Sequence, residues 1–170
     1  MQNSPVTSTS SDLDHWLHVL QSLYPIIGLL YIGAGTGTGN ITRWLKHSQV
    51  RPVWLVEGDE TRHRTLQRGL LPEYQGWTAL NCIVGAQTEV TDFYVTTNPE
   101  GSGLLTTEQL VEIWPGLTTV ATKTAAPAIS MDELAAKCSP NINWLVLDCL
   151  PSLRLLQGAA HLLTEVDVLI

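Results

Sequence analysis

Three glycines at alternate positions, Gly33, Gly35 and Gly37, are the residues whose type and spacing point most directly to chemistry. They follow an apolar run that ends at Ile32 and precede a segment of helical character that begins near Asn40. A strand, a glycine turn and a helix in this order direct backbone N–H groups and the positive end of a helix dipole toward a ligand. A side chain in the turn would hold the ligand away from the backbone, and such turns often require a positive φ. The segment therefore predicts a ligand-binding loop, and a glycine turn without a ligand is the alternative.

The spacing of the glycines narrows the class of ligand. A dinucleotide fingerprint has the pattern G-x-G-x-x-G, and this chain has Thr38 or Asn40 at the third glycine position, depending on the register. A phosphate-binding P-loop requires Gly-Lys-Ser/Thr, which is absent. The G-x-G-x-G pattern is instead found in methyltransferases that use S-adenosylmethionine. A nicotinamide-dependent oxidoreductase is the third interpretation, and the glycine spacing disfavours it.

The composition is that of a globular protein of one domain, because 44% of the 170 residues are hydrophobic and 15% are charged. A net charge of -7 with nine Lys and Arg residues argues against nucleic acid or an anionic membrane as the main partner. Cys82, Cys138 and Cys149 are odd in number and widely spaced, which favours free thiols in a reducing compartment. Since neither a signal-peptide pattern nor a membrane-spanning apolar run is found, a cytoplasmic location is expected.

Apolar strands alternate with helical segments over the first half of the chain. Residues 1–12 are polar and are expected to form a disordered tail before the domain, residues 13–170. The elements expected next are a helix over Leu13–Leu23, a strand over Gly28–Ile32, a helix over Asn40–His47, a strand over Pro52–Glu57, a helix over Glu60–Gly69 and a strand over Thr78–Val84. This alternation predicts parallel strands joined by right-handed crossovers.

The second half begins with a different pattern. Glu89–Val95 alternates as in a half-exposed antiparallel strand, and Thr118–Ala125 is its expected partner. Ser130 is expected to cap the next helix, with Glu133 completing a capping box. A strand over Asn143–Leu147, a helix over Pro151–Thr164 and a fifth core strand over Val166–Ile170 follow. The expected fold is α/β: a Rossmann-like three-layer sandwich with a mostly parallel sheet, an antiparallel hairpin inserted after the third strand, and no C-terminal strand pair.

Two carboxylates end apolar strands at the edge of the sheet where open parallel sheets bind their ligands. Glu57 ends the second strand, about 20 residues beyond the last glycine of the loop, where a carboxylate can accept hydrogen bonds from both ribose hydroxyls. Asp148 ends the strand Leu145–Leu147. It is either part of the site or a cap of the following turn. With the glycine loop, these residues predict a site for a ligand that carries a ribose.

Four blocks of sequence, in this order, resemble the FkbM family of S-adenosylmethionine-dependent methyltransferases. The blocks are Tyr31–Gly37, Leu55–Gly58, Ser102–Leu105, and a last one that runs from Ile129–Leu134 through Leu145–Asp148 to Leu155–Ala159. The last block is similar to the family's helix start and to its strand–aspartate–helix signature. The resemblance covers nearly everything from about Gly28 to Ile170, and the order and spacing of the blocks carry it.

The resemblance implies a cofactor site and an activity. The glycine loop would hold the methionine end of S-adenosylmethionine, Glu57 its ribose, and the backbone near Cys82 to Gly85 its adenine. The cofactor-binding residues that this implies are Tyr31, Gly33, Ala34, Gly35, Gly37, Glu57, Gly58, Val84 and Gly85. The implied reaction is methyl transfer to a hydroxyl of a small-molecule or glycan substrate.

The chain departs from the family's pattern around the same site. Tyr31 stands where the family usually has an acid that helps to organise the loop, and Leu150 and Leu153 stand where the family has glutamates. Leucine can neither transfer a proton nor bind a cation. Asp148 is the remaining candidate for a catalytic residue. A methyltransferase-like module that binds the nucleoside, or nothing, without catalysis is therefore the second interpretation.

Two surface features complete the expectations. Arg62, His63 and Arg64 follow Glu57 on a polar helix and are expected to form its solvated face, and the histidines of the chain show no spacing that favours a metal site. The apolar strand Val166–Ile170 has no later segment to pair with. An unpaired apolar edge favours association, so a homodimer through this edge or the preceding helix is expected, with a frayed strand in a monomer as the alternative.

Overall fold

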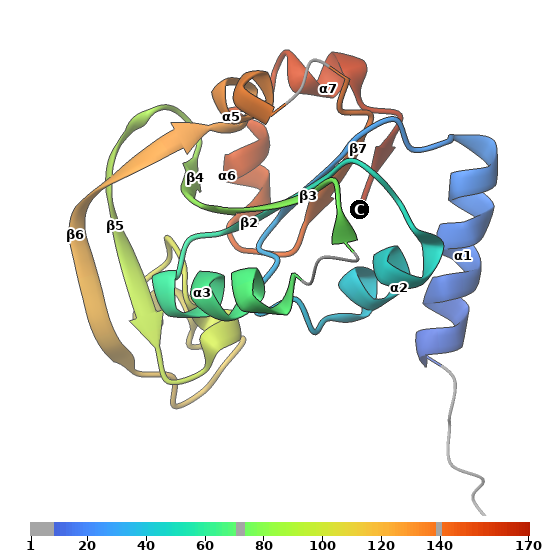
Figure 1. Ribbon diagram of the computed structural model, residues 1–170. Helices are drawn as coiled ribbons and strands as arrows, with labels where there is room; N and C mark the ends of the chain where they lie inside the picture. The colour runs from blue at the N-terminus through green and yellow to red at the C-terminus, as the bar shows by residue number, and fades with distance from the viewer. Residues whose placement is uncertain (1–8, 71–73, 139–140) are drawn as a thin grey trace, which may run out of the picture.

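The computed structural model describes residues 9–70, 74–138 and 141–170 and shows a mixed α/β fold with two sheets (Figure 1). The first sheet has five parallel strands in the order β3-β2-β1-β7-β8, and the second has three strands in the order β4-β6-β5. The strands are β1 Leu29–Ile32, β2 Val53–Glu57, β3 Trp77–Asn81, β4 Ile83–Gly85, β5 Glu89–Thr96, β6 Thr119–Ser130, β7 Trp144–Leu147 and β8 Val168–Leu169. The helices are α1 Thr9–Leu23, α2 Asn40–Ser48, α3 Glu60–Gly69, the 3-10 turn η2 Pro99–Gly101, α4 Thr107–Leu110, α5 Met131–Cys138, α6 Ser152–Leu156 and α7 Leu162–Glu165.

Helices cover both faces of the parallel sheet, because successive side chains of a strand point to opposite faces. Leu29 and Tyr31 of β1 pack in one buried cluster with residues of α1, α2 and α3, among them Trp44. Leu30 and Ile32 pack in a second cluster with residues of α5, α6 and α7. The expected α/β architecture with a parallel sheet is thus confirmed, and Val168 of β8 belongs to the first cluster as expected for a fifth core strand.

The chain between β3 and β7 carries the inserted hairpin. β5 and β6 pair antiparallel, with Tyr94 opposite Thr122, and β4 pairs parallel with β6. Figure 1 shows this pair as a long curved ribbon beside the parallel sheet. The antiparallel pairing is confirmed, although β6 continues to Ser130, beyond the expected end at Ala125.

The strand expected over Thr78–Val84 is two strands in different sheets, so this prediction was wrong. β3 pairs with β2 as far as Asn81 opposite Glu57, where β2 ends. The Cys82 amide still donates to the Glu57 carbonyl at 3.2 Å, and the chain then leaves as β4 to pair with β6. The break falls where β2 ends, because the chain beyond Glu57 enters α3 and offers β3 no further strand to pair with.

The helix expected over Pro151–Thr164 is also two helices, α6 and α7. Gly158 lies between the two helices, and a Cβ there would be 2.5 Å from the Ala86 carbonyl oxygen, so only glycine fits this close approach of the two backbones. Asp132 then caps the start of α7, because its carboxylate accepts from the His161 and Leu162 amides at 3.0 and 2.7 Å. Long-range contacts thus override the apolar periodicity of this segment.

One expected helix start differs from the structure, and one expected capping box is half formed. α1 begins at Thr9 and not near Leu13, so residues 9–12 belong to a helix, with Asp12 in its first turn. The rest of the expected tail, residues 1–8, lies outside the described residues. Ser130 Oγ accepts from the Glu133 amide as expected, but the Glu133 carboxylate bonds Thr88 and Lys137. The capping box is therefore incomplete, and Thr88 Oγ1 accepts from the Ser130 amide instead.

β8 is hydrogen bonded to β7 along one side, with the Ile170 carbonyl accepting from the Leu147 amide at 2.8 Å. Association through its other edge stays a prediction. No helix in the described part of the chain is long and apolar enough to cross a membrane.

Candidate functional site

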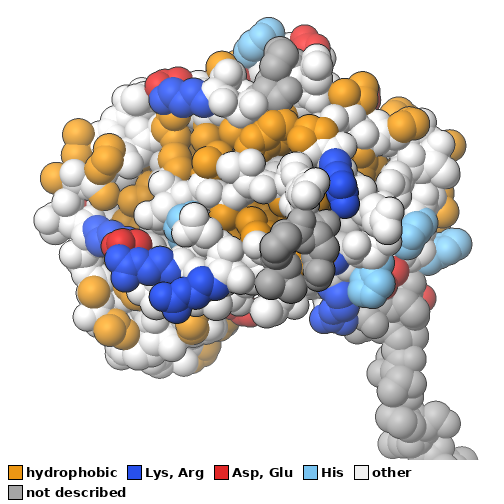
Figure 2. All heavy atoms as spheres, in the orientation of Figure 1, with side chains coloured by type: hydrophobic (Ala, Val, Ile, Leu, Met, Phe, Trp, Pro, Cys, Tyr) orange, Lys and Arg blue, Asp and Glu red, His pale blue; other side chains and the backbone are white. Residues whose placement is uncertain are grey.

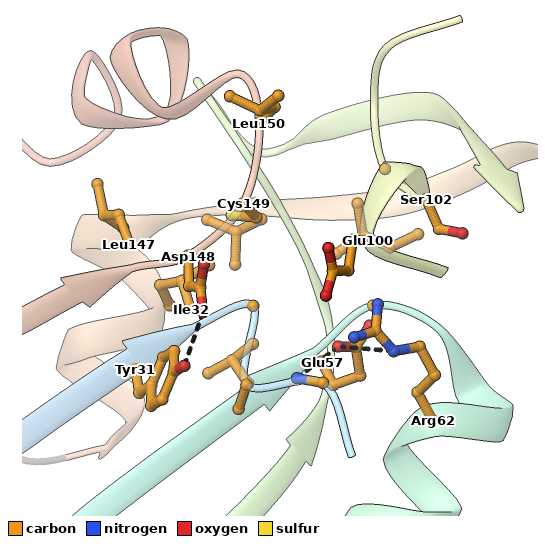
Figure 3. Close-up of a pocket in the computed structure, with 18 of the residues that line it drawn as sticks. Tyr31, Ile32, Glu57, Arg62, Glu100, Ser102, Leu147, Asp148, Cys149 and Leu150 are labelled. Carbon is orange, nitrogen blue, oxygen red and sulfur yellow. Dashed lines mark hydrogen bonds and ion pairs between the residues drawn. The ribbon is translucent and has the colours of Figure 1, made fainter. Parts of the chain in front are cut away.

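A cavity of about 640 Å³ lies at the carboxyl ends of β1, β2 and β7 (Figure 3). Its volume falls within the roughly 300–1,000 Å³ that small-molecule sites occupy. The floor is formed by the loop after β1, the end of β2 and the segment after β7. Residues of β4 line one wall, and a roof segment, Glu100–Leu104, covers the cavity together with Trp114.

Most of the predicted site residues line this cavity. They are Tyr31, Gly33, Ala34, Gly35, Glu57, Gly58, Val84 and Asp148. Gly37 and Gly85 are not among the lining residues. A Cβ on Gly37 would lie 2.7 Å from Leu66 Cδ1, and its φ is +75°. Gly37 is therefore required for packing against α3 and for the turn, not for contact with a ligand in this cavity.

The glycine loop has the predicted backbone conformation, with φ of +85° at Gly33 and +60° at Gly35. Its amides are largely engaged by the protein. The Gly33 and Ala34 amides donate to the Val56 carbonyl at 2.9 and 3.0 Å, and the Gly37 amide donates to the Ala34 carbonyl at 3.1 Å. The expectation that this loop offers free N–H groups is therefore wrong for these residues. Their contacts instead hold the loop rigidly against the end of β2.

Glu57 is buried at the end of β2, with 5% of its surface exposed. Its Oε2 accepts from the Gly35 amide at 2.9 Å, and its Oε1 accepts from the Asp59 amide at 2.8 Å. An ionised carboxylate offers about four lone-pair sites. The two backbone bonds therefore orient Glu57 and leave each oxygen able to accept one more hydrogen bond from the cavity side.

Arg62 is the residue of the site that the sequence analysis missed. Its guanidinium Nη1 donates to the Pro99 carbonyl at 2.6 Å, and its Nε lies 4.0 Å from Glu57 Oε2. Figure 3 shows the guanidinium beside Glu57 in the cavity. The prediction that the basic residues after Glu57 form a solvated helix face is wrong for Arg62. It is confirmed for Arg64, whose side chain is 63% exposed and pairs with Glu60.

A positional signal could have found Arg62. The residue lies in the first turn of the helix that follows β2, where the Asp59 side chain caps its amide at 2.8 Å. A helix that begins at the carboxyl end of a strand places its first-turn side chains beside the strand-end ligand site. Figure 2 shows basic side chains gathered over α3, the helix that carries Arg62, Arg64 and Arg68.

Tyr31 and Asp148 form a pair between β1 and the end of β7. The Tyr31 hydroxyl donates to Asp148 Oδ2 at 2.9 Å. Burial raises the pKa of Tyr31 strongly, and the neighbouring Asp148 carboxylate raises it further. The phenol therefore stays protonated and acts as a hydrogen-bond donor, not as a base.

Cys149 also lines the cavity, next to Asp148. Burial raises the pKa of its thiol to about 12, and the carboxylates of Glu57 and Asp148 contribute to the shift. Burial likewise raises the pKa of Cys82 to about 11. All three cysteines are free thiols, as expected. A thiol that is protonated at neutral pH is a weak nucleophile, which disfavours Cys149 as a covalent catalyst.

Leu150 and Leu153, the positions at which the resemblance implies carboxylates, lie in different surroundings. Leu150 lines the cavity and is 39% exposed, whereas Leu153 is 75% exposed and is not a lining residue. Only Leu150 therefore bears on the chemistry inside the cavity.

The roof segment is fixed to the inserted hairpin. The Tyr94 amide donates to the Gly103 carbonyl at 2.8 Å, and the Gly103 amide donates to the Tyr94 carbonyl at 2.9 Å. Ser102 Oγ accepts from the Thr96 amide at 3.0 Å. The loop Ser102–Leu105, singled out in the sequence, thus reaches the same cavity as the glycine loop.

No group of three or more His, Cys, Asp or Glu residues is arranged to hold a metal ion in the described part of the chain. Comparison of the chain with family models, with curated proteins and with solved structures found no match.

Proposed function

We propose that this chain is an S-adenosylmethionine-dependent methyltransferase with a Rossmann-like fold, related to the FkbM family. The observation that carries the proposal is the position of Glu57. Its carboxylate ends β2, bonds the Gly35 amide of the glycine loop at 2.9 Å and lines the cavity. A buried, oriented carboxylate beside a G-x-G-x-G loop is suited to accept hydrogen bonds from the two hydroxyls of a ribose.

The strand order supports a ligand site at this place. If the five strands of the parallel sheet are numbered by their order in the chain, the spatial order β3-β2-β1-β7-β8 becomes 3-2-1-4-5. From β1 the chain adds strands first on one side and then on the other, so the topological switch point lies between β1 and β7. Doubly wound sheets bind their ligands outside the carboxyl ends of the strands at such a point, and the cavity lies there.

The cavity offers a distinct surface to each part of the cofactor. We assign the methionine end to the loop at Gly33–Gly35, the ribose to Glu57 and the adenine to the apolar wall at Ile83 and Val84. When bound, S-adenosylmethionine supplies an electrophilic methyl carbon on a sulfonium. The wall at β4 is buried and apolar, which suits a purine ring.

The pair of Tyr31 and Asp148 supplies the acid–base chemistry of the proposal. With the cofactor bound, Asp148 would accept the proton of the acceptor hydroxyl on the oxygen that Tyr31 does not bond, as that hydroxyl takes the methyl group and the sulfonium becomes a neutral thioether. Tyr31 holds the carboxylate in place through its hydrogen bond to Oδ2. Alignment of the acceptor contributes more than acid–base catalysis to such a transfer.

Calorimetric titration with three ligands in parallel tests the proposal. We expect S-adenosylmethionine and S-adenosylhomocysteine to bind and NAD to bind more weakly or not at all. Tighter binding of NAD than of these two ligands would overturn the assignment to the methyltransferases, since the glycine spacing was the reason to disfavour a dinucleotide.

A second function is a nucleoside-binding module without methyl transfer. Leu150 favours it, because this exposed apolar side chain lines the cavity where the resemblance implies a carboxylate. In that case the cofactor binds and no acceptor is methylated at an ordinary enzymatic rate of about 1 per second or more. Single-turnover assays with hydroxyl acceptors distinguish the two functions.

A further inference from the structure

Arg62 fills the space that the second glycine of the loop leaves open. A Cβ on Gly35 would lie 2.5 Å from Arg62 Nη2, so the guanidinium rests directly on the glycine backbone. The same guanidinium bonds the Pro99 carbonyl in η2, directly before the roof segment. One side chain therefore reaches from α3 across the glycine loop to η2.

The backbone of Arg62 is fixed, while its side chain is held weakly. Asp59, which is buried, accepts a hydrogen bond from the Arg62 amide and anchors it in the first turn of α3. The side chain has its hydrogen bond to Pro99, but its distance to Glu57 Oε2 is 4.0 Å. Its Nε is buried and makes no hydrogen bond. A buried donor without a partner is unfavourable, so this arrangement is poised to change when a better partner arrives.

Glu57 is the group for which Arg62 and a ligand compete. The guanidinium lies beside Oε2 of a carboxylate whose two hydrogen bonds both come from the backbone. A vicinal diol that bonds Oε2 would approach the oxygen with which the guanidinium is paired. Binding of the diol therefore competes with the present position of Arg62.

We propose that Arg62 is a latch: it closes the cavity by joining α3 to the roof segment over Gly35, and a ligand with a vicinal diol releases it by taking its place at Glu57. The proposal rests on the proposed function only for the identity of that ligand, a nucleoside. The closed latch lowers the apparent affinity, because only the fraction of molecules with Arg62 displaced is competent to bind.

The first measurement uses the protein without ligand. Hydrogen exchange followed by mass spectrometry compares the wild type with Arg62→Ala, Arg62→Gln and the matched control Arg64→Ala, which removes an exposed charge from the same helix. We expect faster exchange in residues 97–104 of both Arg62 variants and no change in the control. Unchanged exchange in both Arg62 variants would overturn the latch.

The second measurement is calorimetric binding of S-adenosylhomocysteine to the same proteins. Removal of the competitor predicts binding about three- to tenfold tighter in Arg62→Ala than in the wild type. This gain in affinity should vanish when Arg62→Ala is introduced into Glu57→Gln, so that Glu57→Gln and the double variant bind equally well. Weaker binding in Arg62→Ala would show that Arg62 contacts the ligand and would overturn the latch.

The two measurements separate the latch from the proposed function. If residues 97–104 exchange faster in the Arg62 variants and none of the proteins binds a nucleoside, the proposed function fails, and with it the diol as the releasing group. The role of Arg62 in closing the roof would stand on the exchange data. If a nucleoside binds equally well with and without Arg62, the proposed function stands and the latch fails.

Discussion

The Tyr31 hydroxyl donates a hydrogen bond to Asp148 Oδ2 at 2.9 Å, which joins the end of β1 to the end of β7. In the register of these strands Tyr31 lies opposite Val146, so Asp148 is two residues further along on the same face. The phenol thus reaches the carboxylate across the strand ends. Tyr31 is thus the hydrogen-bond partner of Asp148, the proposed base.

The raised pKa of Tyr31 predicts a loss of stability at high pH. Burial and the Asp148 carboxylate both disfavour the phenolate in the folded protein. The unfolded chain therefore releases this proton first, near pH 10, and the contribution of Tyr31 to stability is full below that pH and falls as the pH rises above it. Denaturant unfolding at a series of pH values should show a shallower decline in Tyr31→Phe. An identical pH dependence in the two proteins would contradict the assignment.

The thiol of Cys149 should be slow to react. Burial and two neighbouring carboxylates raise its pKa to about 12, so little thiolate is present at neutral pH. Alkylation with iodoacetamide at pH 8, read residue by residue by mass spectrometry, should label Cys149 more slowly than Cys138, whose pKa is raised to about 11. Preferential labelling of Cys149 would show a thiolate that the cavity stabilises.

Gly37 should affect stability more than ligand binding. A side chain there would meet Leu66 at 2.7 Å and would force an unfavourable φ of +75°. Gly37→Ala is expected to lower the free energy of unfolding by about 1–3 kcal/mol. The predicted clash is with the Leu66 side chain, so Leu66→Ala should relieve it. The double variant Gly37→Ala/Leu66→Ala should therefore lose less stability than the sum of the two single variants. Additive effects of the two substitutions, measured by denaturant unfolding, would contradict the predicted contact.

The cap of α7 gives a further test of the C-terminal half. Asp132 accepts from two amides at the start of this helix. Loss of a helix cap typically costs about 0.5–2 kcal/mol, so Asp132→Ala should lower the free energy of unfolding by that amount. Asp12→Ala, which removes the acidic residue in the first turn of α1, is the variant to which its loss of stability is compared. A neutral Asp132→Ala would contradict the stabilising role of this cap.

The features that the sequence predicted are those set by local pattern. The apolar runs around Leu30 and Leu145 predicted buried parallel strands, and the strand-end position of Glu57 predicted its place in the cavity. The alternation of polar and apolar residues over Glu89–Val95 predicted an antiparallel strand, because this pattern too lies within one element. Each depends on residues within one element and on the general rule that the carboxyl ends of parallel strands share an edge.

The features that the sequence did not predict depend on contacts between distant segments. Arg62 has the composition of a surface residue, and only the fold brings its guanidinium to Pro99. Gly158 lies in an apolar helical pattern, and its backbone approaches Ala86 too closely for a side chain. Gly37 matches the glycine pattern, but its neighbour in space is Leu66 and not the cavity. Sequence periodicity carries no information about such neighbours.

The most direct test of the central claim is the binding of S-adenosylhomocysteine to the wild type and to Glu57→Gln, measured by calorimetry. Glu60→Gln, an exposed position on the adjacent helix, is the control, and thermal unfolding shows whether each variant is folded. A hydrogen bond to a charged group contributes about 1.5–3 kcal/mol, so loss of the carboxylate should weaken binding at least about tenfold and leave the control unchanged. Equal affinity of the wild type and Glu57→Gln for S-adenosylhomocysteine would contradict the account.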